Sequence, residues 1–357
     1  MTELSDLPIR DSLRGLTPYG APQLNVPIAL NVNENSHRIP EDVALDVVSR
    51  LAAAVLNINR YPDREFTSLR EKLAEYLGHG LSKDQLWAAN GSNEVIQQIF
   101  QAFGGPGRKA LGFKPTYSMY SLIALGTDTE YVEAARAERF ELTPELVRAA
   151  IAEHKPDIVM LCAPNNPTGT SISLECIEAA YAATDGIVVV DEAYAEFAHD
   201  QTAAAVSLLP GRERLLVSRT MSKAFAFAGA RVGYLAADPA VIDALRLVRL
   251  PYHLSAFTQA AAEAALDHAD EMLATVNDIR IQRDRLVTEL KKLGFDPYDS
   301  DSNFVLFGGV EDPKATFEAL LAKGILVRNV GLPGTLRVTA GTEAETTAFL
   351  NALGELS

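Results

Sequence analysis

Between about residue 40 and residue 240, segments with the periodicity of amphipathic helices alternate with short apolar runs. Strands that are buried on both faces carry such runs, and the alternation is typical of βαβ units. We therefore predict an α/β fold with a mostly parallel sheet and helices on both of its faces. The expected helices are 41–56, 65–77, 93–103, 143–153 and 173–184, and the expected strands lie near 85–89, 109–113, 129–133, 157–163, 186–190, 214–218 and 231–237.

The remainder of the chain predicts a second, smaller domain. After Pro251 the composition shifts to an alanine- and charge-rich stretch, 256–293, which predicts one long helix or two in series. A smaller α+β unit follows, with strands at 303–307, 325–328 and 336–339 and helices at 312–322 and 343–354. At about 150 residues per domain, 357 residues also suggest two. The predicted parts are an N-terminal arm, 1–37, which joins the small domain, a large domain, 38–250, and the small domain, 251–357.

The composition disfavours several classes of protein. A net charge of −15 argues against nucleic acid and anionic membranes as partners. No stretch approaches the ~18 apolar residues of a membrane span, and the charged N-terminus lacks the apolar core of a signal peptide. Only Cys162 and Cys176 are present, so a disulfide scaffold is unsupported and we expect a cytoplasmic protein. The six histidines show no paired ligand spacing, so we predict no metal site.

The segment RTMSKAFAFAGARVGY, from Arg219 to Tyr234, places Lys223 among small residues. A lysine whose pKa is lowered by its surroundings becomes a nucleophile and can form a Schiff base with an aldehyde cofactor. Ser222 offers a hydroxyl donor and Arg231 a planar cationic fork, which together suit a phosphate group. A solvated surface lysine is the alternative interpretation, and this segment alone does not exclude it.

Two upstream segments place polar side chains directly after buried strands. DIVMLCAPNNPTG ends in a turn that contains Asn166, and GIVVVDEAYAEF delivers Asp191 and then Tyr194. Ligands bind at the carboxyl ends of strands in open α/β sheets. Each residue also has a structural interpretation: Asp191 as a helix cap, Asn166 as a turn former and Tyr194 as a core residue. Their order ahead of Lys223 favours one shared cofactor site.

In order and spacing, APNNPTG, DEAY and SKAFAFAGARVGY resemble the fold-type I aminotransferases that depend on pyridoxal phosphate. The resemblance implies a large domain built on a mostly parallel seven-stranded sheet, with a smaller α+β domain. It also implies that Lys223 carries the cofactor as a Schiff base and shuttles the proton. Asp191 is then expected to pair with the ring nitrogen, and Asn166 and Tyr194 with the phenolic oxygen. FKPTYSMY offers Tyr117 as a face to stack on the ring, with core packing as the alternative.

The cofactor phosphate is expected to be held from two segments. One is the turn NGS in WAANGSNEVIQQIF, which opens into an amphipathic helix and directs free N–H groups and the positive end of the helix dipole at an anion. A simple helix cap at Ser92 is the alternative there. The residues to which the resemblance assigns the phosphate are Thr220, Ser222 and Arg231, with the backbone amides of Ser92 and Asn93.

Within these aminotransferases, the chain is most similar to the histidinol-phosphate branch. The shared segments are LTPYGAP, LNVNEN at 30–35, NRYPD at 59–63 and LPYHLS at 250–255. The resemblance implies transamination of L-histidinol phosphate with 2-oxoglutarate, giving imidazole-acetol phosphate and glutamate in histidine biosynthesis. In that branch Tyr61 reaches across a dimer interface to the partner's cofactor phosphate, so a homodimer is expected.

The substrate pocket must accept a phosphate in one half-reaction and carboxylates in the other. Arginine binds both groups bidentately. Arg328 and Arg337 lie on adjacent strand-like segments around a turn that contains Gly331, Pro333 and Gly334. The resemblance assigns Arg337 to the substrate's carboxylate or phosphate, with Arg328 assisting. The other candidate substrate-binding residues are Tyr19, Asn93, Asn166 and Tyr252.

Other classes of protein share part of this sequence pattern or of this type of fold. An aromatic amino acid aminotransferase shares these motifs, because it also accepts a planar ring beside an amine. A threonine-phosphate decarboxylase has the same scaffold but releases CO₂ and needs no keto-acid acceptor. A regulator with a pyridoxal phosphate domain would carry a DNA-binding domain ahead of the fold, and a nicotinamide dehydrogenase would need G-x-G-x-x-G, which FGGPGR does not supply. We predict an enzyme, a pyridoxal phosphate-dependent aminotransferase.

Overall fold

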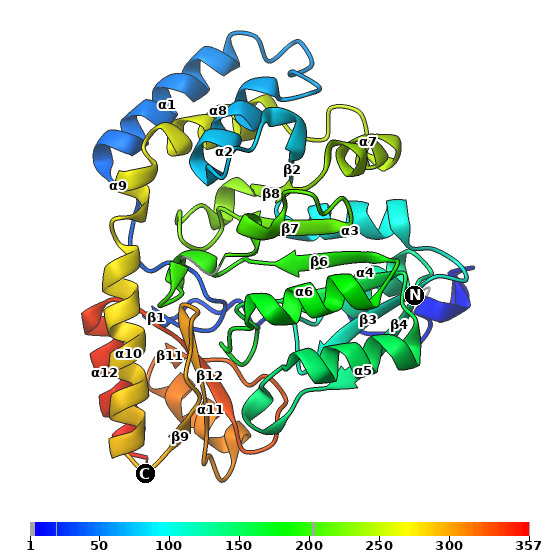
Figure 1. The fold of residues 1–357 in the computed structure, drawn as a ribbon. Coiled ribbons are helices and arrows are strands. Elements are labelled where there is room, and N and C mark those ends of the chain that lie inside the picture. Colours follow the sequence, from blue (N-terminus) through cyan, green and yellow to red (C-terminus); the bar gives the residue numbers. More distant parts are fainter. Residues whose placement is uncertain (1–3, 19, 202–203, 357) are drawn as a thin grey trace.

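The computed structural model describes residues 4–18, 20–201 and 204–356 (Figure 1). At its centre lies a seven-stranded sheet with the strand order β2-β8-β7-β6-β5-β3-β4. Its strands are β2 (Leu86–Ala89), β3 (Lys109–Lys114), β4 (Glu130–Ala135), β5 (Ile158–Cys162), β6 (Ile187–Asp191), β7 (Leu215–Thr220) and β8 (Gly233–Ala236). The pairs from β4 to β7 are parallel, and β8 is antiparallel to both of its neighbours. The predicted fold class, with its mostly parallel seven-stranded sheet, is confirmed.

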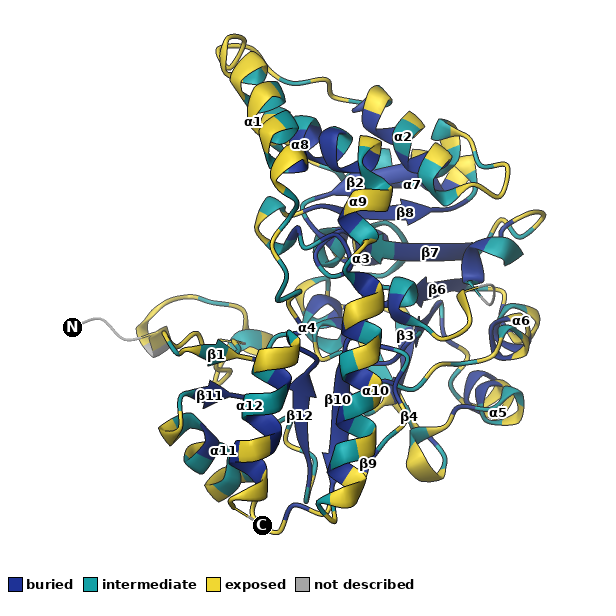
Figure 2. Ribbon diagram, turned by 90° about the vertical axis from the view of Figure 1, so that its left-hand side faces the viewer, coloured by how far each residue is buried: buried dark blue, intermediate teal, exposed yellow. Residues whose placement is uncertain are grey.

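Helices cover both faces of this sheet. They are α3 (Ser92–Phe103), α4 (Met119–Gly126), α5 (Pro144–His154), α6 (Leu174–Ala183) and α7 (Pro239–Val248). α3 packs against α4 and α7, whereas α5 packs against α6 on the opposite side, as the two views agree (Figures 1 and 2). Every residue of β5 and β6 is buried, because strands covered on both faces bury all of their side chains. Two of these helices, α4 and α7, were not expected from the sequence.

A second group of helices lies beyond the β2 edge of the sheet. It comprises α1 (Glu41–Val55), α2 (Thr67–Leu77) and α8 (Ala256–Asp267), and α8 packs on the other two. The expectation of one or two helices over 256–293 was wrong. Three occur, because the backbone of His268 leaves the helical region after α8, and α9 (Ala269–Leu273) precedes α10 (Val276–Lys292). Because of this break, α8 packs against α1 and α2, whereas α10 packs against a second, smaller sheet.

That second sheet has the order β12-β10-β9. Its strands are β9 (Asp296–Pro297), β10 (Phe304–Gly308) and β12 (Leu336–Thr339), and the helices beside it are α10, α11 (Pro313–Ala322) and α12 (Glu343–Gly354). The N-terminal arm reaches this unit through β1 (Ile28–Ala29), which pairs in parallel with β11 (Ile325–Leu326). The boundaries expected at residues 38 and 251 stay predictions.

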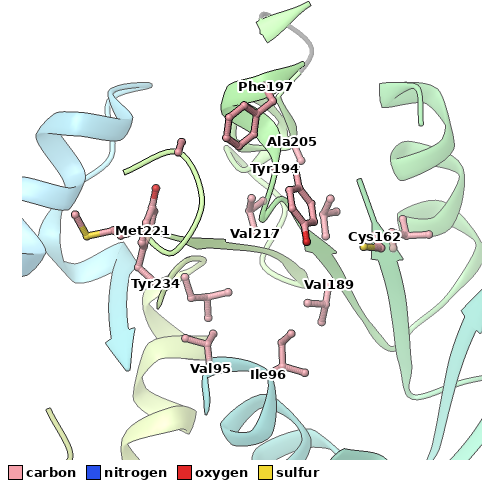
Figure 3. Packing of buried hydrophobic residues seen from close by; sticks show 14 of the residues in the cluster. Val95, Ile96, Cys162, Val189, Tyr194, Phe197, Ala205, Val217, Met221 and Tyr234 are labelled. Carbon is pink, nitrogen blue, oxygen red and sulfur yellow. The ribbon is translucent and has the colours of Figure 1, made fainter. Parts of the chain in front are cut away.

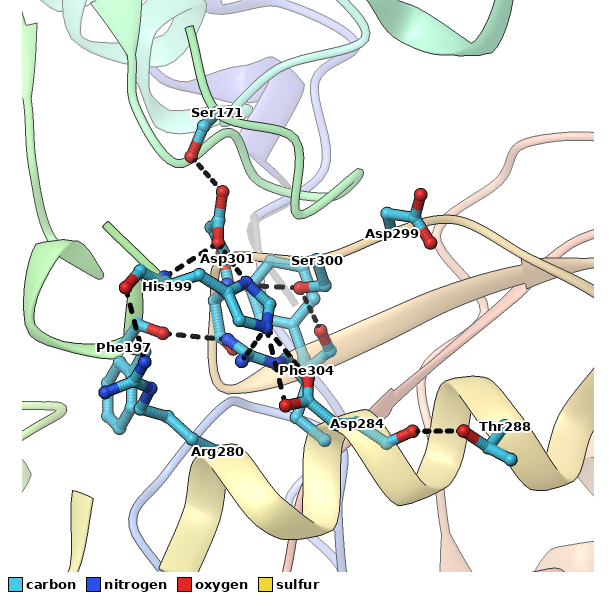
Figure 4. Close-up of polar contacts among 12 residues, drawn as sticks. Ser171, Phe197, His199, Arg280, Asp284, Thr288, Asp299, Ser300, Asp301 and Phe304 are labelled. Atoms are coloured by element: carbon cyan, nitrogen blue, oxygen red, sulfur yellow. Dashed lines mark hydrogen bonds and ion pairs between the residues drawn. The ribbon is translucent and has the colours of Figure 1, made fainter. Parts of the chain in front are cut away.

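A polar cluster fixes this unit to the large sheet (Figure 4). His199, on the segment that follows β6, lies between two carboxylates: Nδ1 is 2.6 Å from Asp301, before β10, and Nε2 is 3.2 Å from Asp284 on α10. Arg283 of α10 donates a hydrogen bond of 2.8 Å to the carbonyl of Phe197. These contacts hold the small sheet beside the carboxyl ends of β5 to β7. Beneath those ends lies an apolar cluster that includes Cys162, Val189 and Val217 (Figure 3).

Candidate active site

A cavity of about 1100 Å³ opens at the carboxyl ends of the central strands, where the arm and the small unit meet the large sheet. The predicted cofactor residues that line it are Ser92, Asn93, Tyr117, Asn166, Asp191, Tyr194, Thr220, Ser222, Lys223 and Arg231. Arg328 and Arg337, predicted for the substrate, line it as well. Residues from distant parts of the chain therefore share one site, because parallel strands end at the same edge of their sheet.

Lys223 lies just after β7 with its amine directed across the cavity. Nζ donates a hydrogen bond of 2.9 Å to the carbonyl of Val32 in the arm. Burial lowers the pKa of this amine to about 8, and the positive charges of Arg337 and Arg231 act in the same direction against Glu34. A much larger share of the amine is therefore neutral, and so nucleophilic, near neutral pH than for an ordinary lysine.

Asp191 ends β6 and is only 2% exposed. Its Oδ2 accepts a hydrogen bond of 2.7 Å from the hydroxyl of Tyr120, while its Oδ1 has no partner among the described residues. Burial raises the pKa of this carboxyl group to about 6, and the contact with Tyr120 opposes that change. A buried carboxylate oxygen without a donor is costly. The protonated ring nitrogen of pyridoxal phosphate is the kind of donor that Oδ1 lacks, so this residue fits the cofactor.

The opposite end of the cavity has the features of an anion site. α3 begins at Ser92, where the first N–H groups of the helix lack intrahelical acceptors. Gly91 has φ +87°, and a Cβ atom added there would overlap the guanidinium of Arg231. Arg231 Nη1 lies 3.5 Å from Ser222 Oγ, which also accepts a hydrogen bond of 3.0 Å from Thr220. A helix N-terminus, an arginine and two hydroxyls together fit a phosphate group.

The residues expected beside the cofactor ring are held by hydrogen bonds to other residues of the cavity wall. Tyr194 accepts a hydrogen bond of 3.0 Å from Asn33 Nδ2, and Tyr117 donates one of 3.2 Å to Asn93 Oδ1. Burial raises the pKa of Tyr194, so its hydroxyl stays protonated and able to donate. Asn166 accepts a short hydrogen bond from Arg337.

The two arginines of the substrate pocket form an antiparallel backbone bridge. The N–H of each donates a hydrogen bond of 2.9 Å to the carbonyl of the other, which brings Arg328 and Arg337 to the same wall. The guanidinium of Arg337 donates a hydrogen bond of 2.8 Å to the carbonyl of Asn31 and lies 4.9 Å from the centre of the Phe304 ring. A planar cation held in this way suits a carboxylate or a phosphate.

Two predicted residues, Tyr61 and Tyr252, lie outside the cavity of this chain. Tyr61 and Tyr252 stack on each other with ring centres 4.4 Å apart, and they are 79% and 39% exposed. Neither lines the cavity. Tyr19 lies outside the described residues.

Sequence reasoning missed two residues whose side chains hydrogen-bond to predicted site residues. Asn33 contacts Tyr194, and Tyr120 contacts Asp191. Both belong to segments already singled out, LNVNEN and FKPTYSMY, but only a folded structure shows which member of each segment contacts a predicted site residue.

The described part of the chain offers no cluster of three or more histidine, cysteine, aspartate or glutamate residues able to hold a metal ion. In the same ranges, no helix combines the length and the apolar character that crossing a membrane requires.

Comparisons with known proteins point to one family of enzymes. The family model "Aminotransferase class I and II" matches residues 25–353. A histidinol-phosphate aminotransferase of Paenarthrobacter aurescens is 64% identical over 359 aligned positions, which cover 100% of this chain and 96% of that protein. One of Frankia casuarinae is 59% identical over 98% of this chain and 90% of its own length.

A solved structure gives the same result in three dimensions. Histidinol-phosphate aminotransferase from Sinorhizobium meliloti, in complex with pyridoxal-5′-phosphate, superposes with a TM-score of 0.84 at 25% identity. The superposition covers 93% of this chain and 91% of that one.

Proposed function

The chain belongs to the class I and II aminotransferase family, and from that membership we propose that it transfers the amino group of L-histidinol phosphate to 2-oxoglutarate. The products are imidazole-acetol phosphate and glutamate, and the reaction is a step of histidine biosynthesis. The cofactor is pyridoxal 5′-phosphate. When bound, this group supplies an aldehyde that reacts with amines and a ring that accepts electrons.

We assign two chemical tasks to Lys223. Its amine would hold the cofactor covalently through the aldehyde, a role supported by its lowered pKa of about 8. Once released by the incoming amine, the same group takes the proton from the substrate's Cα. It then returns a proton to the carbon of the cofactor's aldehyde group. In the chain without cofactor, its hydrogen bond to the carbonyl of Val32 holds the free amine inside the cavity.

The other cofactor contacts follow the shape of the cavity. Asp191 would pair with the ring nitrogen and keep it protonated, while Asn166 and Tyr194 would contact the phenolic oxygen and Tyr117 would stack on the ring. The residues proposed for the phosphate are Thr220, Ser222 and Arg231, with the backbone amides of Ser92 and Asn93.

The substrate is held by charge at its acidic groups. Arg337, assisted by Arg328, would bind the phosphate of histidinol phosphate in one half-reaction and a carboxylate of 2-oxoglutarate in the other. The net charge of −15 repels both anions at long range, so local arginines must capture them. Tyr19, Tyr252, Asn93 and Asn166 complete the proposed substrate contacts.

We also propose that the active form is a homodimer in which Tyr61 reaches the partner's cofactor phosphate. Large apolar side chains are exposed on α1, on the segment that follows it, at the end of α7 and just after α7: Leu45, Val48, Leu56, Ile58, Leu247 and Leu250. Buried against a second copy, such side chains would stabilise an isologous dimer. Tyr61 is also largely exposed and stacks on Tyr252. A cytoplasmic location belongs to the same proposal, in keeping with two buried free cysteines.

The observation that carries the proposed function is the single cavity that unites a lysine of lowered pKa, a buried carboxylate with a free oxygen and an arginine fork. The test is the visible absorption of the purified holoprotein after addition of histidinol phosphate alone. Conversion of the cofactor to its amine form without any acceptor is the expected result. An unchanged spectrum would contradict the proposed donor.

A competition between substrates separates this function from its relatives. We expect kcat/KM for histidinol phosphate to exceed that for phenylalanine by at least about a hundredfold, since phenylalanine leaves the phosphate contacts unmade. An equal or greater value for phenylalanine would instead indicate an aromatic amino acid aminotransferase. Release of CO₂ from threonine phosphate, with no requirement for 2-oxoglutarate, would indicate a decarboxylase.

A further inference from the structure

We propose that Tyr120 is a positioning residue for Asp191: its hydroxyl fixes the carboxylate so that the free oxygen faces the cofactor ring and remains ionised. The proposal rests on the proposed function, because it concerns the same cofactor site. Tyr120 lies on α4 and is fully buried, so its hydroxyl has no water to compete with its contact to Asp191. That contact, 2.7 Å from Oη to Oδ2, has the length of a charge-assisted hydrogen bond.

The donor and acceptor roles of this pair are unambiguous. Burial raises the pKa of Tyr120, so the phenol is protonated and donates, and an ionised carboxylate can only accept. No other side chain in the described ranges donates a hydrogen bond to Asp191. Because Oδ2 is tied to Tyr120, the orientation of the carboxylate is set, and Oδ1 is left for a donor in the cavity.

The surroundings of Asp191 offer little else to keep it charged. On β5 its neighbour in register is Cys162, whose pKa burial raises to about 12, so the thiol is neutral. Glu192, which follows β6, disfavours the charge, and only the backbone N–H of Ala193 assists Tyr120. On β7 the paired residue is Ser218, which carries no charge. Without the hydroxyl of Tyr120, the carboxyl group would shift further towards its neutral form.

The ring of Tyr120 has a separate structural task, which the test must preserve. It meets the ring of Tyr117 edge to face, with centres 5.5 Å apart. Tyr120→Phe keeps this packing and removes only the hydroxyl. The matched control is Tyr131→Phe on β4, because Tyr131 Oη is also buried but has no hydrogen-bond partner among the described residues.

The first measurements are made on the apoprotein and on the holoprotein. For Tyr120→Phe we expect the dissociation constant for pyridoxal phosphate to rise by about tenfold or more, as for loss of a hydrogen bond to a charged group. The pH dependence of the bound cofactor's absorption should move, and kcat should fall while KM for histidinol phosphate changes little. Tyr131→Phe should stay within about twofold of wild type in each measurement.

A double-mutant cycle decides whether Tyr120 acts through Asp191. In the Asp191→Asn background, Tyr120→Phe should change cofactor affinity by less than about twofold, because no carboxylate remains to be positioned. The same factor in both backgrounds, or a Tyr120→Phe variant indistinguishable from Tyr131→Phe, would overturn the inference while leaving the proposed function intact. A wild-type protein that binds no pyridoxal phosphate would overturn both.

Discussion

The side-chain amide of Asn33 donates a hydrogen bond of 3.0 Å to the hydroxyl of Tyr194, from 161 positions earlier in the chain. The same amide group accepts a hydrogen bond of 3.3 Å from Thr339 on β12, and the backbone N–H of Asn33 donates one of 3.1 Å to that threonine. Asn33 thus joins the arm and the small unit to the ring-side tyrosine. Because Tyr194 accepts from Asn33, its own proton is free to be donated into the cavity.

We predict that Asn33→Leu, which keeps the size of the side chain, lowers kcat/KM for histidinol phosphate by about tenfold, since the Tyr194 hydroxyl loses its orientation. Thr339→Val removes the other end of the network without touching Tyr194, so it should act in the same direction but more weakly. Steady-state kinetics of both variants provide the check. A larger loss for Thr339→Val than for Asn33→Leu would contradict this order.

A second prediction concerns Gly91 at the start of α3. Gly91→Ala should weaken pyridoxal phosphate binding by at least about tenfold, because φ is +87° and the added Cβ would displace the Arg231 guanidinium. The matched control is Gly229→Ala, in the loop before Arg231, where a Cβ meets no heavy atom within 4 Å. Cofactor titration of the two apoproteins compares them. Equal affinities would show that the turn is not part of the phosphate site.

The residues that line the cavity could be predicted from sequence because most of them lie in short motifs beside strand ends. Strand ends are readable from apolar runs, and the topology of a parallel sheet brings them together. Tyr120 and Asn33 could not be predicted, because their contacts depend on how α4 and the arm pack, and neither is a local property.

The helices α4 and α7 were not predicted from the sequence, for different reasons. α4 spans eight residues, of which most are apolar, so it has no polar face to reveal a helical period. α7 does carry a start signal, since Asp238 caps the helix and Pro239 is its first residue, but no helix was predicted over these residues. The break at His268 lacks the glycine or proline that would mark it in sequence.

The raised pKa of Asp191 predicts how the apoprotein's stability depends on pH. In the folded chain this pKa is about 6, above the ordinary value of 3.8, so folding favours the protonated acid. The stability that the protonated form contributes is complete below pH 4, falls as pH rises from 4 to 6, and is absent above. The difference corresponds to about 3 kcal/mol. Asp191→Asn should therefore raise the apoprotein's free energy of unfolding at pH 7.5 by up to that amount.

Denaturant unfolding of the two apoproteins at pH 4 and pH 7.5 measures this effect. The gain from Asp191→Asn should be present at pH 7.5 and nearly vanish at pH 4, where the wild-type acid is protonated. The same variant should bind pyridoxal phosphate less tightly, because the amide cannot keep the ring nitrogen charged. A stability gain that does not change with pH would contradict the raised pKa.

The proposed dimer predicts that one inactive and one impaired variant restore activity when they are mixed in equal amounts. Lys223→Ala should abolish turnover while leaving part of the cofactor binding, and Tyr61→Ala should weaken the site of the partner. In a mixed dimer, the Tyr61→Ala protomer keeps its own Lys223 and receives Tyr61 from the Lys223→Ala protomer, which gives one intact site. Random exchange of protomers makes half of the dimers mixed, so about one quarter of wild-type activity should return.

The matched control mixes Lys223→Ala with Arg231→Ala, because both side chains line the cavity of their own chain and no intact site can form. Recovery in the control, or none in the first mixture, would mean that Tyr61 does not serve the partner.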